Sequence, residues 1–200
     1  MCVLTRPPIR YNCFMRIGMI AMSAKPFHKG HAHLITSALQ ECDIVNVYVS
    51  MGDRKRRGEI TIFGSDMRTI WNAYIRPYMP SNVNIVLLDK IAPVSAVWNE
   101  LGASDLADKQ DTYLLYGDTD DAANRFSDEL LNLYVPRLVK EELVELRPIS
   151  RSQTGNVSGT AMRSAIENCD KAAFRAGMPR WLDVNAVWQI FRSRLNEQTP

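Results

Sequence analysis

The three histidines of this chain all fall within the stretch SAKPFHKGHAHLI, residues 23–35, at positions 28, 31 and 33. Imidazole groups bind metal ions, transfer protons or donate hydrogen bonds to anions. A helical zinc motif would need two histidines four residues apart with a glutamate between them, and this stretch has neither that spacing nor a nearby cysteine or carboxylate. The residues therefore predict no metal site here.

A phosphate is the better candidate ligand for two of the three histidines. His28 and His31 flank Lys29 and Gly30 at the point where an apolar run gives way to a helical pattern. The first N–H groups of a helix have no partner within the helix, and they bind anions readily. His33 falls inside the helical pattern among apolar residues, so we expect it to be mainly scaffold.

A second stretch with similar chemistry lies far downstream, in NVSGTAMRSAI, residues 156–166. Taken alone, it is typical of a helix start, with Ser158 or Thr160 as the N-cap and Arg163 in solvent. The same residues suit a phosphate, because hydroxyls, backbone N–H groups and a guanidinium all donate to its oxygens.

Together the two stretches resemble a known family. KPFHKGH is similar to the H-x-G-H signature of the nucleotidylyltransferase superfamily, and most similar to its nicotinamide mononucleotide adenylyltransferase branch. The second stretch resembles the family's I-S-G-T-x-x-R, with Val157 in place of the isoleucine. The resemblance spans roughly residues 16–166, and it implies transfer of a nucleoside monophosphate from a triphosphate to a phosphate-bearing acceptor, with release of pyrophosphate and Mg²⁺ bound to the triphosphate.

The resemblance also implies roles for particular residues, with His31 nearest the α-phosphate. The expected catalytic residues are His28, Lys29, His31 and Arg163. The expected nucleotide-binding residues are Ser23, Gly30, Asp118, Ser158, Gly159 and Thr160.

Two other segments each have two open interpretations. Arg54, Lys55, Arg56 and Arg57 follow the second predicted strand, where they would either bind the acceptor phosphate or form a solvated charge run. Asp118 ends the fourth predicted strand, where it would either accept from a ribose hydroxyl or cap the next helix.

The sequence does not determine which nucleoside triphosphate and which acceptor the protein uses. Relatives usually carry a glycine and an aromatic residue before H-x-G-H, where this chain has Met22 and Ala24. ATP is favoured over CTP, and nicotinamide mononucleotide over phosphopantetheine, a sugar phosphate or an alcohol phosphate. A nucleotide-binding or structural protein without turnover is the alternative of another class, and a metal-dependent hydrolase is a weaker one.

The elements that must position these residues alternate between strand and helix. Short apolar runs bounded by turn residues predict buried strands at residues 16–23, 43–51, 82–89, 112–117 and 143–150. Helical patterns occupy residues 30–42, 65–79 with Ser65 as N-cap, 94–101, 127–143 with a break at Pro136, 158–168, 170–179 and 183–195. We predict the α/β class, a Rossmann-like doubly wound parallel sheet of about five strands with a helical C-terminal tail.

Composition sets the remaining limits. The 200 residues suit one domain at 15–200, with residues 167–200 as its helical C-terminal part and residues 1–14 as an extension. A net charge of +2 makes nucleic acid an unlikely partner, and no run is long enough for a membrane span. The four scattered cysteines fit a reducing, cytoplasmic setting, and a homo-oligomer is compatible with the sequence.

Overall fold

The computed structural model describes residues 14–119, 124–150, 152 and 156–198, so the predicted extension at residues 1–14 lies almost wholly outside the described residues. Five strands form one parallel sheet, in the order β3-β2-β1-β4-β5. The strands are β1 (Arg16–Met22), β2 (Ile44–Ser50), β3 (Val83–Leu88), β4 (Thr112–Asp118) and β5 (Val144–Ile149). The predicted doubly wound α/β sheet of five strands is confirmed.

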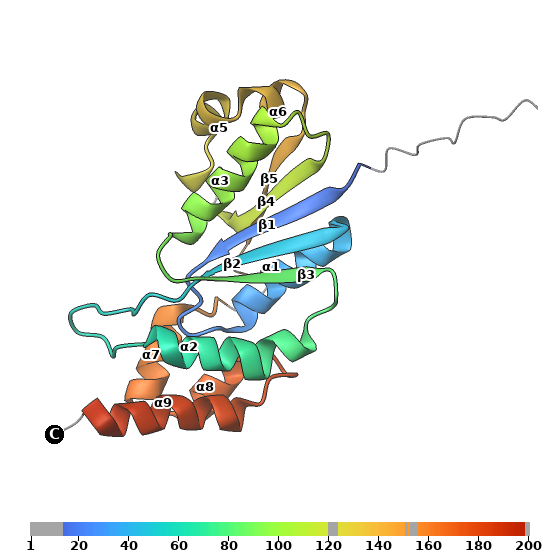
Figure 1. Cartoon of the computed structure of the whole chain (residues 1–200). Helices are drawn as coiled ribbons and strands as arrows, with labels where there is room; N and C mark the ends of the chain where they lie inside the picture. The colour runs from blue at the N-terminus through green and yellow to red at the C-terminus, as the bar shows by residue number, and fades with distance from the viewer. Residues whose placement is uncertain (1–13, 120–123, 151, 153–155, 199–200) are drawn as a thin grey trace, which may run out of the picture.

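Helices cover both faces of the sheet (Figure 1), which explains why the central strands β1, β2 and β4 are mostly apolar, while the edge strand β5 carries Glu145 and Arg147. In β1, Ile17 and Met19 belong to one buried cluster, while Ile20 and Met22 belong to the other. One face carries α3 (Pro93–Leu106), α5 (Asp128–Tyr134) and α6 (Pro136–Lys140). The other carries α1 (Lys29–Glu41), α2 (Gly64–Ile70), α7 (Gly159–Glu167), α8 (Lys171–Gly177) and α9 (Val184–Gln198).

The start of α2 differs from the sequence expectation. The N-cap position is Phe63 rather than Ser65, and the side chain of Asp53 accepts from the Gly64 N–H at 3.0 Å. A Cβ on Gly64 would lie 1.5 Å from the carbonyl oxygen of Met51, so only glycine allows α2 to approach the end of β2 this closely. The helical path then continues through a π segment, Trp71–Ile75, and a 3₁₀ turn, Arg76–Tyr78.

The C-terminal helices brace the face that carries α1. Arg194 of α9 pairs with the buried Asp66 of α2 at 3.0 Å and stacks over the Phe63 ring at 5.1 Å. The predicted helical tail is therefore packed against the domain. Within the described residues, no helix combines the length and the apolar character that a membrane span needs.

Candidate active site

A cavity of about 330 Å³ opens where the carboxyl ends of β1, β4 and β5 meet the N-termini of α1 and α7. In open α/β sheets, ligands bind at this edge, beside the point where the strand order reverses, which here lies between β1 and β4. Most of the predicted site residues line it: Ser23, His28, Gly30, His31, Arg54, Asp118, Ser158, Gly159, Thr160 and Arg163. Lys29, Lys55, Arg56 and Arg57 are not among its lining residues.

The histidine turn is held by a capping box at the start of α1. His28 is the N-cap, and its Nδ1 accepts from the backbone N–H of Gly30 at 3.1 Å. The Nδ1 of His31 accepts in return from the backbone N–H of His28 at 3.3 Å. The two rings stack with their centroids 3.8 Å apart. Each imidazole is therefore fixed by a backbone group three residues away or less.

These contacts decide which nitrogen of each ring carries the proton. A nitrogen that accepts from an N–H group is unprotonated, so a neutral His28 or His31 holds its hydrogen on Nε2. Both residues line the cavity, His28 being buried and His31 half-buried. The hydrogen bonds of the turn thus fix the tautomer of both neutral imidazoles, so that each has an N–H donor at Nε2.

His33 also lines the cavity, two residues further along α1. The expectation that it is mainly scaffold is untested by this placement. Lys29 is the first residue of α1, half-buried, and its side chain lies outside the cavity lining.

The second motif opens α7, whose N-terminus also lines the cavity. Ser158 is the N-cap, and its hydroxyl accepts from the backbone N–H of Ala161 at 3.2 Å. Ser158, Gly159 and Thr160 all line the cavity, so the positive end of the α7 dipole faces the same space as the histidine turn.

Arg163 is far more constrained than a solvated helix side chain would be. It is only 4% exposed, and its guanidinium donates to the Lys25 carbonyl oxygen at 2.9 Å and to the Thr160 hydroxyl at 2.9 Å. Glu59 faces the other edge of the guanidinium, with Oε2 2.9 Å from Nε and Oε1 3.2 Å from Nη2. Burial lowers the pKa of Arg163 and the Glu59 carboxylate opposes that shift, so the ion pair is retained.

Glu59 belongs to the loop that carries the basic run. Arg54 and Ile62 close this loop with an antiparallel bridge, and Arg54 pairs with Glu59 at 3.1 Å. The hydrogen bonds from Arg163 and Arg54 lower the pKa of Glu59 below its ordinary value. The loop after β2 is thereby attached to α7 through one carboxylate.

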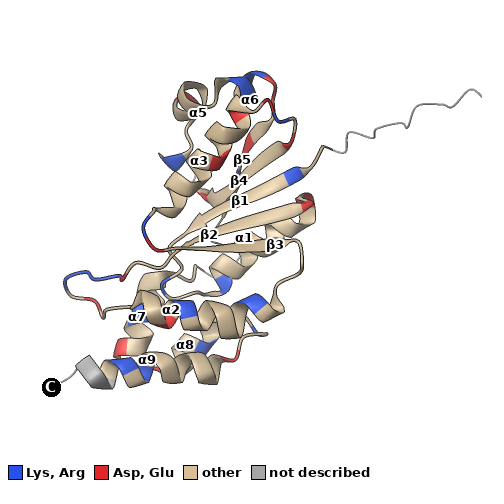
Figure 2. Cartoon of the chain, in the orientation of Figure 1, with Lys and Arg blue, Asp and Glu red and all other residues tan. Residues whose placement is uncertain are grey.

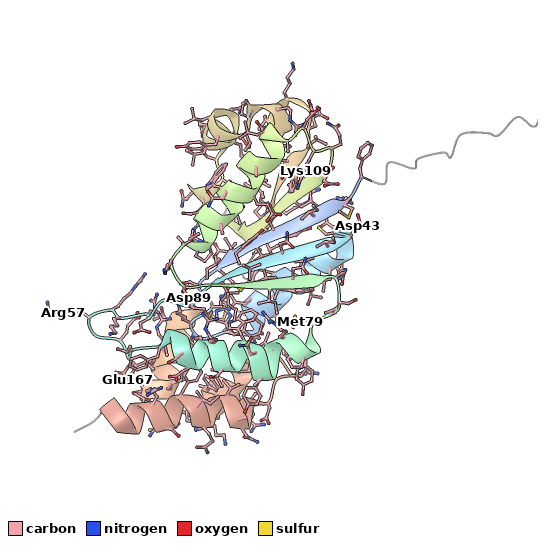
Figure 3. All side chains as sticks on the ribbon, in the orientation of Figure 1. Asp43, Arg57, Met79, Asp89, Lys109 and Glu167 are labelled. Atoms are coloured by element: carbon pink, nitrogen blue, oxygen red, sulfur yellow. The ribbon has the colours of Figure 1, made fainter. Side chains whose placement is uncertain are left out.

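The basic run itself divides into two parts. Arg54 lines the cavity, whereas Lys55, Arg56 and Arg57 are exposed. Figure 2 shows the basic tip of this loop projecting beyond the carboxyl edge of the sheet, and Figure 3 shows Arg57 pointing away from the domain. The geometry favours the interpretation of residues 55–57 as a solvated charge run.

Two further cations line the cavity and were missed from the sequence. Lys25 lies inside the first motif itself, and Arg125 follows β4. A signal for Lys25 was available, since a polar residue immediately after a buried strand points to the ligand edge of a parallel sheet. For Arg125 there was no motif to identify it.

The lining is rich in cations and poor in acids. It contains Lys25, Arg54, Arg125 and Arg163, and among the described lining residues Asp118 is the single carboxylate. Within the described part of the chain, no group of three or more histidine, cysteine, aspartate or glutamate side chains could hold a metal ion. This composition suits a ligand with several negative charges.

Comparison with known proteins supports the fold assignment. The protein-family model Citrate lyase ligase C-terminal domain matches residues 17–61, which run from the second residue of β1 through the histidine turn, α1 and β2 into the loop after β2. No curated protein matches the chain by sequence.

Several solved structures share the fold at low sequence identity. TmcAL of Thermotoga maritima, bound with alpha-thio ATP, has 15% identity and a TM-score of 0.52 over 92% of this chain. A bifunctional NMN adenylyltransferase/ADP ribose pyrophosphatase from Francisella tularensis, complexed with AMP and a Mn ion, has 15% identity and a TM-score of 0.54 over 92% of this chain. This chain spans 56% and 54% of the length of those two proteins.

A third neighbour is similar in size. Plasmodium falciparum nicotinic acid mononucleotide adenylyltransferase, complexed with NaAD, has 16% identity and a TM-score of 0.53, over 88% of this chain and 97% of that one. The chain therefore has the Rossmann-like fold of proteins that bind adenine nucleotides.

Proposed function

We propose that this protein is a nucleotidylyltransferase that transfers AMP from ATP to a phosphate-bearing acceptor. The observation that carries the proposal is that two motifs about 130 residues apart line one cation-rich cavity, each at the N-terminus of a helix. The neighbours named for adenylyltransferase activity or for bound adenine nucleotides support the same class.

The reaction needs alignment and charge stabilisation more than covalent chemistry. An oxygen of the acceptor phosphate attacks the α-phosphorus, the bond from that phosphorus to the bridging oxygen of the β-phosphate breaks, and pyrophosphate leaves with the electron pair. A phosphate acceptor is already ionised at neutral pH, so the step requires no general base.

In this account, His28 and His31 donate from Nε2 to the triphosphate, with His31 at the α-phosphate. Because their tautomers are fixed before substrate binds, these donors need no reorganisation during the reaction. Ser158, Gly159 and Thr160 bind the β- and γ-phosphates at the start of α7. Ser23 and Asp118 lie beside the nucleotide, where Asp118 accepts from a ribose hydroxyl.

Arg163 takes part only after an exchange of partners. Its donors already contact Glu59, Thr160 and the Lys25 carbonyl, so a phosphate oxygen must replace the Glu59 carboxylate on the guanidinium. Mg²⁺ is expected to enter with the triphosphate, since it binds substrate phosphates and keeps several waters. When bound, it neutralises charge on the phosphate oxygens.

Nicotinamide mononucleotide is the proposed acceptor, giving NAD as the product. The support is the K-P-F-H-K-G-H form of the first motif, together with neighbours named as NMN and nicotinic acid mononucleotide adenylyltransferases. A cytidylyltransferase, or an adenylyltransferase for phosphopantetheine, a sugar phosphate or an alcohol phosphate, would use the same cavity chemistry.

The test is Mg²⁺-dependent release of pyrophosphate, with ATP or CTP crossed against nicotinamide mononucleotide and the other phosphate acceptors. We expect release with ATP and nicotinamide mononucleotide. Release with another pair would retain the class and correct the substrates. Tight binding of ATP with no release from any pair would contradict the proposal and favour a nucleotide-binding protein without turnover.

A further inference from the structure

Lys25 is a buried cation with few polar neighbours. Its side chain lies at the end of β1 with the residue 5% exposed, and its ammonium donates to the Ser50 hydroxyl at 3.0 Å. An ammonium has three N–H donors, and Ser50 Oγ is the hydrogen-bond acceptor that the described residues provide for it. Lys25 also lines the cavity.

Placing a lysine there has a cost in folding free energy. Burial disfavours the charged form and lowers the pKa of Lys25, while the carboxylate of Asp53 opposes this shift and Arg54 adds to it. An apolar side chain of similar length would fill the same space without the desolvation penalty. A buried lysine that faces a cavity is therefore better explained by an anion that enters it than by packing.

The position of the ammonium indicates which anion. The strand order reverses between β1 and β4, and Asp118, proposed above to accept from the ribose, ends β4. The Lys25 side chain reaches the opposite way, to Ser50 at the end of β2. In an in-line displacement, the attacking group approaches opposite the leaving pyrophosphate, so the β2 side is where the acceptor enters.

We propose that the Lys25 ammonium binds the phosphate of the acceptor. This inference rests on the proposed function and deepens it, because it assigns the acceptor subsite to the floor of the cavity rather than to the exposed residues Lys55, Arg56 and Arg57. The acceptor phosphate adds negative charge beside Lys25 and Arg54, where the described lining residues include no carboxylate other than Asp118 at the end of β4. Lys25 is then a specificity residue for acceptors that carry a phosphate or similar anion near the attacking oxygen.

The test compares Lys25→Met with wild type in steady-state assays of pyrophosphate release from ATP and nicotinamide mononucleotide. We expect the KM for nicotinamide mononucleotide to rise about 10- to 100-fold, as for the loss of a hydrogen-bonded charge, while the KM for ATP stays close to wild type. Lys109→Met is the matched control, since Lys109 is exposed and lies at the other edge of the sheet (Figure 3). It should leave both KM values unchanged.

A second measurement keeps the inference independent of turnover and of the fold of the variant. Wild-type protein is treated briefly with acetic anhydride, and acetylation of Lys25 and Lys109 is followed by peptide mass spectrometry. Nicotinamide mononucleotide should protect Lys25 but not Lys109, and ATP alone should protect Lys25 much less.

The outcomes separate the two proposals. Wild-type protein that releases no pyrophosphate would overturn the proposed function, while protection of Lys25 by nicotinamide mononucleotide would still support the acceptor subsite. An unchanged KM for nicotinamide mononucleotide in a folded Lys25→Met protein, or a rise confined to the KM for ATP, would overturn the assignment of Lys25. Absence of protection by nicotinamide mononucleotide would overturn it as well.

Discussion

The two walls of the cavity are held in different ways. The histidine turn is fixed by hydrogen bonds between residues two and three positions apart in the sequence. Arg163 on the α7 wall is fixed by the Lys25 carbonyl and by Glu59, which are 138 and 104 positions away. Local contacts form whenever α1 forms, whereas the contacts of Arg163 need the whole domain and the loop after β2.

This difference indicates that the histidines serve mainly the reaction, whereas Arg163 serves both the fold and nucleotide binding. The donors on His28 and His31 are ready before substrate arrives, and their loss should affect the reaction more than the fold. Arg163 connects three segments of the chain, so its loss should affect the fold as well as nucleotide binding. Substitutions in the histidine turn and at Arg163 test the two sides of this contrast separately.

The largest effect is expected for His31→Ala. Removing one preorganised donor from a transition-state oxyanion lowers kcat by about two to three orders of magnitude. The melting temperature should change much less than the rate, because the capping hydrogen bond is long, at 3.3 Å, and the stacking with His28 is a local contact within the same turn. Pyrophosphate release and thermal unfolding, measured on the same preparation, check both points.

His33→Ala is the matched control, because His33 lies on the same helix and also lines the cavity. We expect it to retain most of the activity. A loss equal to that of His31→Ala would show that the histidines act as one cluster, and it would refute the special role of the capped pair.

The next effect is expected for Arg163→Met, and it should appear first in stability. The substitution removes the donors to the Lys25 carbonyl and the Thr160 hydroxyl and leaves the Glu59 carboxylate with Arg54 alone, so we expect the melting temperature to fall by roughly 5–10 °C. Scanning calorimetry of the variant against wild type measures this. A variant as stable as wild type would mean that the long-range contacts of Arg163 contribute little to the fold.

Glu59→Gln should strengthen nucleotide binding, whereas the loss of Arg163 should weaken it. If Glu59 occupies the guanidinium edge that a phosphate oxygen needs, removing its charge should lower the KM for ATP by about 3- to 10-fold. Initial rates over a range of ATP concentrations at saturating Mg²⁺ give this value. An increase in the KM would instead mean that Glu59 positions Arg163 for the nucleotide.

The smallest effect is expected for Ser158→Ala. Losing the N-cap hydroxyl of α7 typically costs about 1 kcal/mol of unfolding free energy. Urea unfolding checks this, and Ser164→Ala, an exposed position on the same helix, is the control. Equal midpoints for the two variants would argue against a capping role for Ser158.

Much of the fold could be predicted from the sequence because the central strands β1, β2 and β4 are largely buried. A short, mostly apolar run such as residues 44–50 is typical of a central parallel strand. The bounds of the predicted strands agree with the structure to within one or two residues. The start of α2 could not be predicted, because Ser65 has the local chemistry of an N-cap. The close approach of Gly64 to Met51, a tertiary contact, accompanies an N-cap two positions earlier, at Phe63.

The candidate site divides in the same way. The positions of His28 and His31 follow from adjacent residues, so their spacing was sufficient to bring them to the cavity. The pairing of Glu59 with Arg163 could not be predicted, because nothing in the sequence of the loop after β2 specifies a partner on α7. The position of Lys25 after a buried strand pointed to the ligand edge of the sheet, but its burial could not be predicted, because the contact with Ser50 at the end of β2 forms only in the folded domain.

The most direct test of the central claim is where the label of ATP goes. Parallel reactions with [α-³²P]ATP and [γ-³²P]ATP, in the presence of the acceptor that gives the fastest release, should place the α label on the acceptor and the γ label in pyrophosphate. Transfer of the γ label to the acceptor, or its appearance as orthophosphate formed directly by the enzyme, would contradict attack at the α-phosphorus and with it the role proposed for the cavity.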